Sequence, residues 1–155
     1  MPSRSVWRIA RRPHALDRLG TGARLEGGRW NYPGTSVIYA SASIAIAALE
    51  KFVHLAGVIP LDLVLVRVEL QNNCSAEQLK LADLPGDWSL VPPGPASMAI
   101  GTTWATENRS LVLYAPSVLV PEENNVLINP NHPEFRAVKM SIERDYRYDP
   151  RMHAR

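Results

Sequence analysis

The sequence has a single cysteine and no long uncharged apolar segment. Cys74 is the one cysteine among its 155 residues, so no internal disulfide can form. The lack of disulfides fits a reducing cytoplasm. A membrane span needs about 18 uncharged residues, but the longest apolar stretch, residues 41–70, is broken by Glu50, Lys51, His54, Asp62 and Arg67. No apolar block follows the basic start, which argues against a secretory signal. We therefore expect a cytoplasmic protein that does not contact a membrane.

Several cofactor and metal motifs are also missing. The sequence has no Walker A lysine motif, no H-E-x-x-H and no cysteine or histidine pair at metal spacing, so we expect no metal. Residues 20–28, GTGARLEGG, begin like a dinucleotide fingerprint, but Leu25 stands where the third glycine is needed. We therefore expect no redox cofactor, and we interpret His54, His132 and His153 as structural or surface residues.

Positive charge is concentrated near the start of the chain, although the net charge is only +2. Residues 1–30 carry seven arginines against Asp17 and Glu26. Such a segment suggests an anionic partner, which can be nucleic acid, nucleotide phosphate or an acidic protein. A solvated basic surface explains most of these arginines equally well.

The apolar pattern predicts one α+β domain over residues 1–155, with a mainly antiparallel or split sheet and few helices. Alternating or β-branched runs separated by Gly and Pro predict short strands, whereas residues 81–97 are rich in Pro and Gly and are expected to form a surface loop. The strand candidates lie within residues 5–10, 35–41, 62–70, 110–121, 124–135 and 136–149.

Residues 43–56 are predicted to form a helix. Ser43 can serve as N-cap, Gly57 can take the left-handed position after the end, and Pro60 prevents continuation. Glu50 falls at the edge of the wide apolar arc of this helix. We therefore expect Glu50 to face the lip of a cleft rather than the core or bulk water.

Residues 27–50, GGRWNYPGTSVIYASASIAIAALE, resemble the signature of the RES domain, a family of toxins from toxin–antitoxin pairs named for its Arg, Glu and Ser. The resemblance continues in LADLPGDW (81–88), in residues 100–135 and in YRYDPRM (146–152). It therefore spans nearly the whole chain, and the order and spacing of the pieces make it specific.

The resemblance implies a compact fold similar to ADP-ribosyltransferases and a toxin that consumes NAD as a substrate. Members cleave the nicotinamide–ribose bond by hydrolysis or phosphorolysis, and some ADP-ribosylate a protein instead. The resemblance also implies a cognate antitoxin of the Xre helix-turn-helix type, in a higher-order complex.

Five residues match the functional positions of the family. Arg29, Tyr39, Glu50 and Ser117 are the expected catalytic residues, and Arg8, Arg29, Tyr39 and Ser117 are expected to bind NAD. These residue types suit the chemistry, because guanidinium groups bind phosphates in a bidentate manner, an aromatic ring can stack on the cationic nicotinamide, and a carboxylate stabilises an oxocarbenium-like ribose. A serine hydroxyl can supply one oriented hydrogen bond. Trp30 and Asn31 match the motif too and are expected only to hold the Arg29 turn.

The sequence leaves the acceptor of the ADP-ribosyl group open. Water, phosphate or a protein side chain could attack the same ribosyl cation, so a mono-ADP-ribosyltransferase is the first alternative. A nucleic-acid-binding toxin or nuclease would use the basic residues 1–30, and a non-enzymatic interaction module would need none of the five. We expect no direct contact with nucleic acid.

Overall fold

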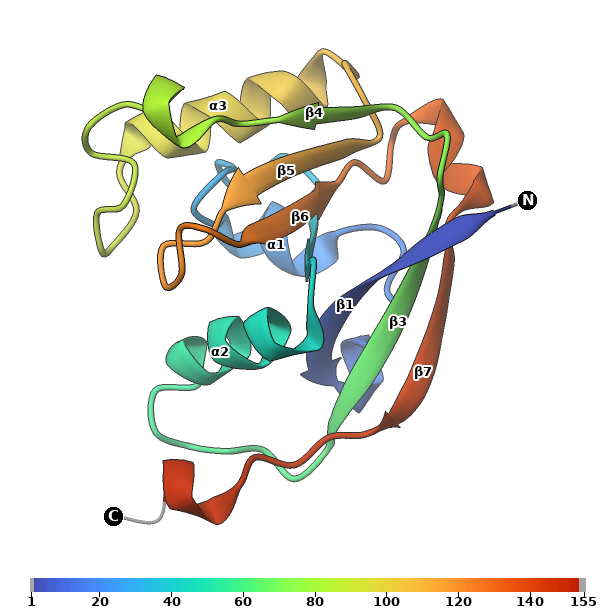
Figure 1. Cartoon of the computed structure of the whole chain (residues 1–155), viewed down its shortest axis with the longest axis vertical. Helices are drawn as coiled ribbons and strands as arrows, with labels where there is room; N and C mark the ends of the chain where they lie inside the picture. Colours follow the sequence, from blue (N-terminus) through green and yellow to red (C-terminus); the bar gives the residue numbers. More distant parts are fainter. Residues whose placement is uncertain (1, 154–155) are drawn as a thin grey trace.

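The computed structural model describes residues 2–153, and within them the chain forms one α+β domain built on a seven-stranded sheet (Figure 1). Met1, Ala154 and Arg155 of the expected domain lie outside the described residues. The sheet order is β4-β5-β6-β2-β1-β3-β7, and every neighbouring pair is antiparallel except β4 and β5. The expected α+β fold with a mainly antiparallel sheet is therefore confirmed.

Six of the seven strands overlap the predicted strand candidates, and β4 was not predicted. The strands are β1 Ser3–Arg11, β2 Ile38–Ser41, β3 Leu63–Gln71, β4 Ala76–Gln78, β5 Val112–Pro116, β6 Asn124–Ile128 and β7 Lys139–Asp145. The helices are α1 Thr21–Glu26, α2 Ile44–His54 and α3 Pro95–Thr106, with short 3-10 turns η1 Arg12–His14, η2 Leu81–Asp83, η3 Pro133–Ala137 and η4 Pro150–Met152. Within residues 2–153, no helix is long and apolar enough to cross a membrane.

The sheet is divided between β1 and β2. These two strands pair only at Trp7 and Ser41, whereas β1 pairs β3 along its whole length. Figure 1 shows the half with β1, β3 and β7 turned away from the half with β4, β5 and β6. Alternate residues from both halves meet in one buried core, which includes Val64, Val66, Val68, Val112, Val126 and Ile128. The two halves are therefore held together mainly by this shared core, as the split-sheet prediction requires.

Strand β3 is more deeply buried than its alternating pattern predicts. Val64, Val66, Val68 and Leu70 form the expected apolar face, but Leu63 and Leu65 on the other face are buried as well. They pack under α2 together with Ile9 and Tyr148. Arg67 and Glu69, near the end of the strand, keep the expected partial exposure.

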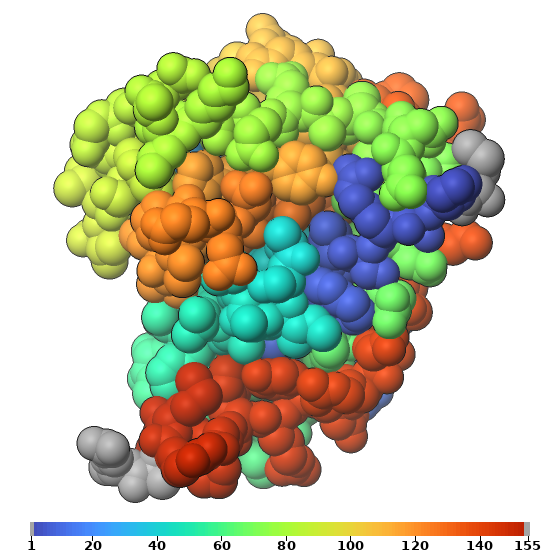
Figure 2. Space-filling model, viewed as in Figure 1, coloured from blue at the N-terminus to red at the C-terminus, as the bar shows by residue number. Residues whose placement is uncertain are grey.

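Helix α2 begins as predicted, because the Ser43 side chain accepts a hydrogen bond from the Ile46 amide at 3.2 Å. It ends two residues early, and Ala56 (φ 50°) and Gly57 (φ 85°) both take left-handed conformations after it. The segment after β7 packs against this helix (Figure 2). There the Tyr148 hydroxyl donates to the Ala48 carbonyl at 2.5 Å, and its ring lies 5.3 Å from that of Phe52.

Helices α1 and α3 were not expected, and α3 replaces the end of the loop predicted over residues 81–97. Pro95 occupies the first turn of α3, where a missing N–H costs nothing. Gly101 lets the helix backbone touch the Arg29 turn, since a Cβ at this position would lie 1.9 Å from the Trp30 carbonyl oxygen. The contact that holds α3 is thus made by a residue that sequence patterns associate with loops.

Replacing Gly101 by Ala should therefore lower the free energy of unfolding by about 3 kcal/mol, because the added methyl group forces two backbone segments apart. Gly22→Ala is the matched control, because Gly22 is also helical and a Cβ at that position would meet nothing within 4 Å. We expect that control to keep or raise stability by up to about 1 kcal/mol. Urea titration of the two variants and the parent measures both effects, and equal stability of all three would contradict the tight contact.

Candidate active site

The Arg29 turn, residues 28–31, is a tight loop held by the buried residues Trp30 and Asn31. Gly28 and Asn31 pair across it, and the Asn31 amide nitrogen donates to the carbonyls of Ala23, Tyr32 and Thr35 at 2.9–3.1 Å. Trp30 is 1% exposed and stacks on Trp88 with 6.1 Å between ring centroids. The structure therefore gives Trp30 and Asn31 the holding contacts that the sequence interpretation assigned to them.

The Arg29 guanidinium is held through one nitrogen. Its Nη1 donates to the carbonyls of Trp88 (2.9 Å) and Leu90 (2.8 Å), in the loop before α3. Burial lowers the pKa of the Arg29 guanidinium, and the nearby negative charge of Glu50 opposes this shift. No ion pair joins Arg29 to Glu50, and Nε and Nη2 make no hydrogen bond within residues 2–153. One edge of the guanidinium therefore has no hydrogen-bond partner among the described residues.

Tyr39 lies under this turn and fixes it. Its hydroxyl donates to Asn31 Oδ1 at 2.6 Å and accepts from the Trp30 amide at 3.1 Å. Burial raises the pKa of the Tyr39 phenol, so it stays protonated and keeps both bonds. Gly28 is required here, since a Cβ would lie 2.7 Å from the Tyr39 hydroxyl oxygen.

Glu50 and Ser117 come together although 67 residues separate them. Glu50 Oε1 accepts from the Ser117 hydroxyl at 2.8 Å and from the Asn125 amide nitrogen at 2.8 Å. Ser117 is fully buried, and its Oγ also accepts from the amides of Leu119 and Val120. Glu50 Oε2 has no hydrogen-bond partner among the described residues. Glu50 is partly exposed.

Arg8 differs from the other four candidate residues, because its side chain has no bonded partner among the described residues. It lies between Val6 and Ala10, on the face of β1 that contributes to the shared core, and no hydrogen bond or ion pair of its side chain occurs within residues 2–153. Burial lowers the pKa of the Arg8 guanidinium, and the charge of Asp17 partly compensates. Burial and the charge of Arg8 also lower the pKa of Lys51, the residue after Glu50. No hydrogen bond or ion pair joins Arg8 to the other four among the described residues, although α2, which carries Glu50, packs against β1.

Most other arginines of residues 1–30 are engaged in contacts within the chain, two of them with a carboxylate. Arg11 pairs with Asp62 at 3.0 Å, and Arg12 pairs with Asp145. Arg18 donates to the carbonyls of Phe135 and Val138, and Arg4 donates to the Tyr114 hydroxyl. The local charge excess therefore does not form one free basic surface. This distribution weakens the case for a nucleic-acid-binding toxin, which would need such a surface.

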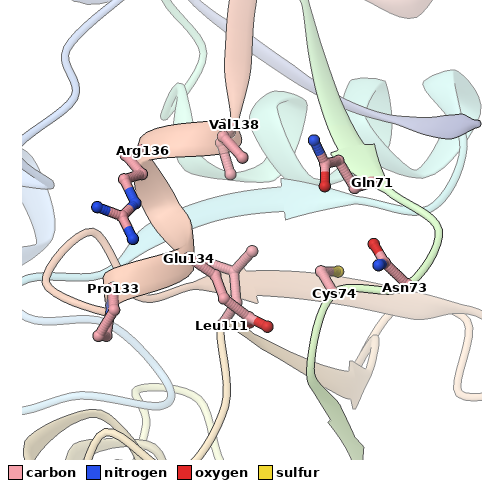
Figure 3. A pocket seen from close by; sticks show the side chains of 9 residues that line it. Gln71, Asn73, Cys74, Leu111, Pro133, Glu134, Arg136 and Val138 are labelled. Atoms are coloured by element: carbon pink, nitrogen blue, oxygen red, sulfur yellow. The ribbon is translucent and has the colours of Figure 1, made fainter. Parts of the chain in front are cut away.

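A recess of about 270 Å³ lies elsewhere, between the end of β3 and η3. Figure 3 shows Gln71, Asn73 and Cys74 on one side of it and Pro133 and Arg136 on the other. None of the five candidate residues lines it. The described residues also contain no group of three or more His, Cys, Asp or Glu that could hold a metal ion.

Sequence reasoning missed Asn125 and Ser41. Asn125 donates to Glu50, and its Oδ1 accepts from the Ser41 hydroxyl at 2.8 Å. The sequence gives one signal for Asn125, a polar amide side chain in a strand that is otherwise apolar after it. Its pairing with Ser41 depends on the register between β2 and β6, which the sequence does not show.

Comparisons with known proteins agree with this fold. The RES domain family profile matches residues 5–149. The chain is 44% identical to the "Prs ADP-ribosylating toxin" of Sphingobium sp. (strain YBL2), over 96% of each chain, and 36% identical to "Toxin Res" of Yersinia enterocolitica, over 93% and 95%. Its fold matches a chain in the crystal structure of the M. tuberculosis MbcT–MbcA toxin–antitoxin complex, with a TM-score of 0.69 at 16% identity, covering 99% of this chain and 88% of that one.

The Tyr39 contacts predict a stability effect. Tyr39→Phe removes the hydroxyl and leaves the buried Trp30 amide and Asn31 Oδ1 without this partner, so the free energy of unfolding should fall by about 2 kcal/mol. Tyr32→Phe is the control, because the Tyr32 hydroxyl bonds the Pro95 carbonyl at a 37% exposed position, and it should cost less than about 1 kcal/mol. Chemical denaturation compares the two, and equal losses would show that the Tyr39 hydroxyl does not secure the turn.

Proposed function

The chain belongs to the RES domain family of toxins, and on this premise we propose that it consumes NAD by cleaving the bond between nicotinamide and ribose. The observation that carries the proposal is the Glu50 carboxylate, which is fixed through Oε1 and has Oε2 without a partner in residues 2–153. Departure of nicotinamide leaves positive charge on the ribose, as in glycoside hydrolysis. A carboxylate held in advance beside that charge stabilises the transition state more than the ground state.

The free edge of Arg29 supports binding of the NAD diphosphate. Trp88 and Leu90 carbonyls hold only Nη1, so Nε and Nη2 can donate to phosphate oxygens in parallel. Arg8 supplies a second cation, desolvated and close enough to Lys51 to lower the pKa of that lysine. An anion beside Arg8 and Lys51 would relieve the repulsion between these two cations, because opposite charges attract each other strongly where water is excluded.

Tyr39 and Ser117 take more limited roles in this proposal. The Tyr39 hydroxyl is committed to the Arg29 turn, so Tyr39 would contact nicotinamide only through its ring, a contact of about 1 kcal/mol. Ser117 is buried and gives its one proton to Glu50. It would therefore act on NAD through the carboxylate rather than by touching the substrate itself.

The acceptor of the ADP-ribosyl group defines a second candidate function. The Sphingobium relative is named for ADP-ribosylating Prs, and it is 44% identical over nearly the whole chain. Transfer to a protein and transfer to water or phosphate share the same bond cleavage and differ only in the nucleophile that follows. We therefore propose mono-ADP-ribosylation of a protein as the alternative to hydrolysis or phosphorolysis, with Prs as the first acceptor to test.

An antitoxin partner follows from the same reasoning. The similar M. tuberculosis fold was solved as a toxin–antitoxin complex, and a protein that destroys NAD in the cytoplasm would harm its own cell. We propose that a cognate Xre-type antitoxin, in a higher-order complex, covers the Arg29 and Glu50 side chains. A segment that offers carboxylates would imitate the phosphates of NAD, so inhibition by such a segment would compete with the substrate.

Substitution of Glu50 tests the proposed reaction. Glu50→Gln removes the charge but keeps the shape and one oxygen acceptor, so nicotinamide release from NAD should fall by about 100-fold or more while the fold is kept. Glu26→Gln, at the exposed end of α1, is the matched control and should act like the parent. Release is measured by chromatography, with and without Prs, so that modified Prs and free ADP-ribose identify the acceptor. Parent-like turnover in Glu50→Gln would refute the catalytic carboxylate.

Arg29→Lys keeps the charge but loses the planar fork. The ammonium group can replace Nη1 at the Trp88 and Leu90 carbonyls, and no paired donors then remain for phosphate. We expect kcat/KM for NAD to fall by about tenfold or more, since each lost charge-assisted hydrogen bond is worth about 1.5–3 kcal/mol. Arg24→Lys, at an exposed position of α1, should leave kcat/KM unchanged in the same assay. If Arg29→Lys matched Arg24→Lys, bidentate phosphate binding at Arg29 would be wrong.

A further inference from the structure

A chain of hydrogen bonds runs from the sheet to the Glu50 carboxylate. Ser41 on β2 donates to Asn125 Oδ1 at 2.8 Å, and Asn125 Nδ2 on β6 donates to Glu50 Oε1 at 2.8 Å. We infer that Asn125, supported by Ser41, is a positioning residue that sets the orientation of the Glu50 carboxylate for cleavage of NAD. This inference rests on the proposed function, and it adds a residue to which neither the motif nor the family resemblance gave a role.

The carboxylate determines which group donates in each of these two hydrogen bonds. An ionised carboxylate only accepts hydrogen bonds, so the amide group of Asn125 must turn its nitrogen towards Glu50. Its oxygen then faces Ser41, whose hydroxyl can donate to it. A flipped amide would place two acceptors against each other at 2.8 Å. Each side chain in this series of hydrogen bonds therefore has one consistent orientation, and the Ser41 hydroxyl holds the Asn125 amide in its orientation.

The donors around Glu50 Oε1 are also fully assigned. Ser117 has one proton, and its oxygen already accepts from the amides of Leu119 and Val120, so the proton goes to Glu50. With Asn125, two donors occupy the two lone pairs of Oε1. Two donors on a single oxygen fix the plane of the carboxylate as well as its position, which one donor cannot do. Oε2 is thereby held facing away from both donors.

Strand register explains why this pair lies under α2. Asn125 is paired with Ser41, and Ser41 is paired with Trp7. The Trp7–Ser41 pair joins β1 to β2, where the two halves of the sheet meet. Glu50 is therefore attached to the sheet at its junction. Both supports are shielded there, since Ser41 is buried and Asn125 is partly buried.

The test compares two neighbouring asparagines. Asn125→Ala should lower kcat for nicotinamide release by about tenfold, the effect of one lost charge-assisted hydrogen bond. KM for NAD should stay within about twofold, since Asn125 acts on the carboxylate and not on bound NAD. Asn124→Ala is the control, because Asn124 sits on the same strand and, within residues 2–153, its side chain forms hydrogen bonds only with Gln78. Equal kcat for the two variants, or a raised KM with unchanged kcat for Asn125→Ala, would overturn the inference.

A double-mutant cycle with Glu50→Gln separates positioning from other effects. If Asn125 acts through the carboxylate, Asn125→Ala should cost less than about twofold in the Glu50→Gln background. A full tenfold further loss there would mean that Asn125 acts independently of Glu50. If the parent protein releases no nicotinamide, the proposed function fails. If Glu50→Gln keeps parent activity, the role of Glu50 fails and this inference fails with it, whereas an unchanged kcat in Asn125→Ala alone leaves the proposed function standing.

A crystal structure of Asn125→Ala gives a readout that does not need activity. The inference expects the Glu50 carboxylate to rotate away from its parent orientation, while α2 and β6 stay in place. An unchanged carboxylate in that variant would overturn the inference, even if the parent protein released no nicotinamide at all. Melting temperatures within a few degrees of the parent would exclude general unfolding as the cause of any loss of kcat.

Discussion

The structure depends on one constraint, which is that buried polar groups must find hydrogen-bond partners. Within residues 2–153, every buried side-chain nitrogen and oxygen atom has one. At Ser117 this requirement ties α2 to the loop after β5, because the hydroxyl proton has no acceptor other than Glu50. At Asn31 it shapes the loop that presents Arg29. The same bonds that keep the interior satisfied therefore bring together groups from distant parts of the chain.

The two groups proposed to bind NAD each have one side bonded and one side without a partner within residues 2–153. The free oxygen of Glu50 and the free edge of Arg29 have no hydrogen-bond partner among the described residues, while the atoms beside them are fully engaged. A group with one atom fixed and another available needs little reorganisation when a substrate arrives, which is the condition for electrostatic catalysis. Arg8 is different, since no hydrogen bond or ion pair orients its guanidinium within residues 2–153, whereas two carbonyls hold that of Arg29.

Local chemistry in the sequence was sufficient for some parts of this fold and not for others. Period-two alternation identified β3, and the Ser43 cap identified α2, because both signals lie within a few neighbouring residues. Helix α3 was missed because its stability comes from Gly101 packing on Trp30, which is far away in the chain. The candidate residues came from family resemblance and not from the patterns themselves. Neither the sequence patterns nor the family resemblance pointed to Asn125, because its contact with Ser41 depends on the register between β2 and β6.

The bracing of α2 by Tyr148 has a consequence for the timing of synthesis. Tyr148 and Tyr146 pack in the cluster under α2, and both come after all seven strands in the sequence. A ribosome adds these residues late, and they are still inside its exit tunnel when most of the chain before them has emerged. The helix that carries Glu50 therefore acquires its final support only after the other elements are free to fold.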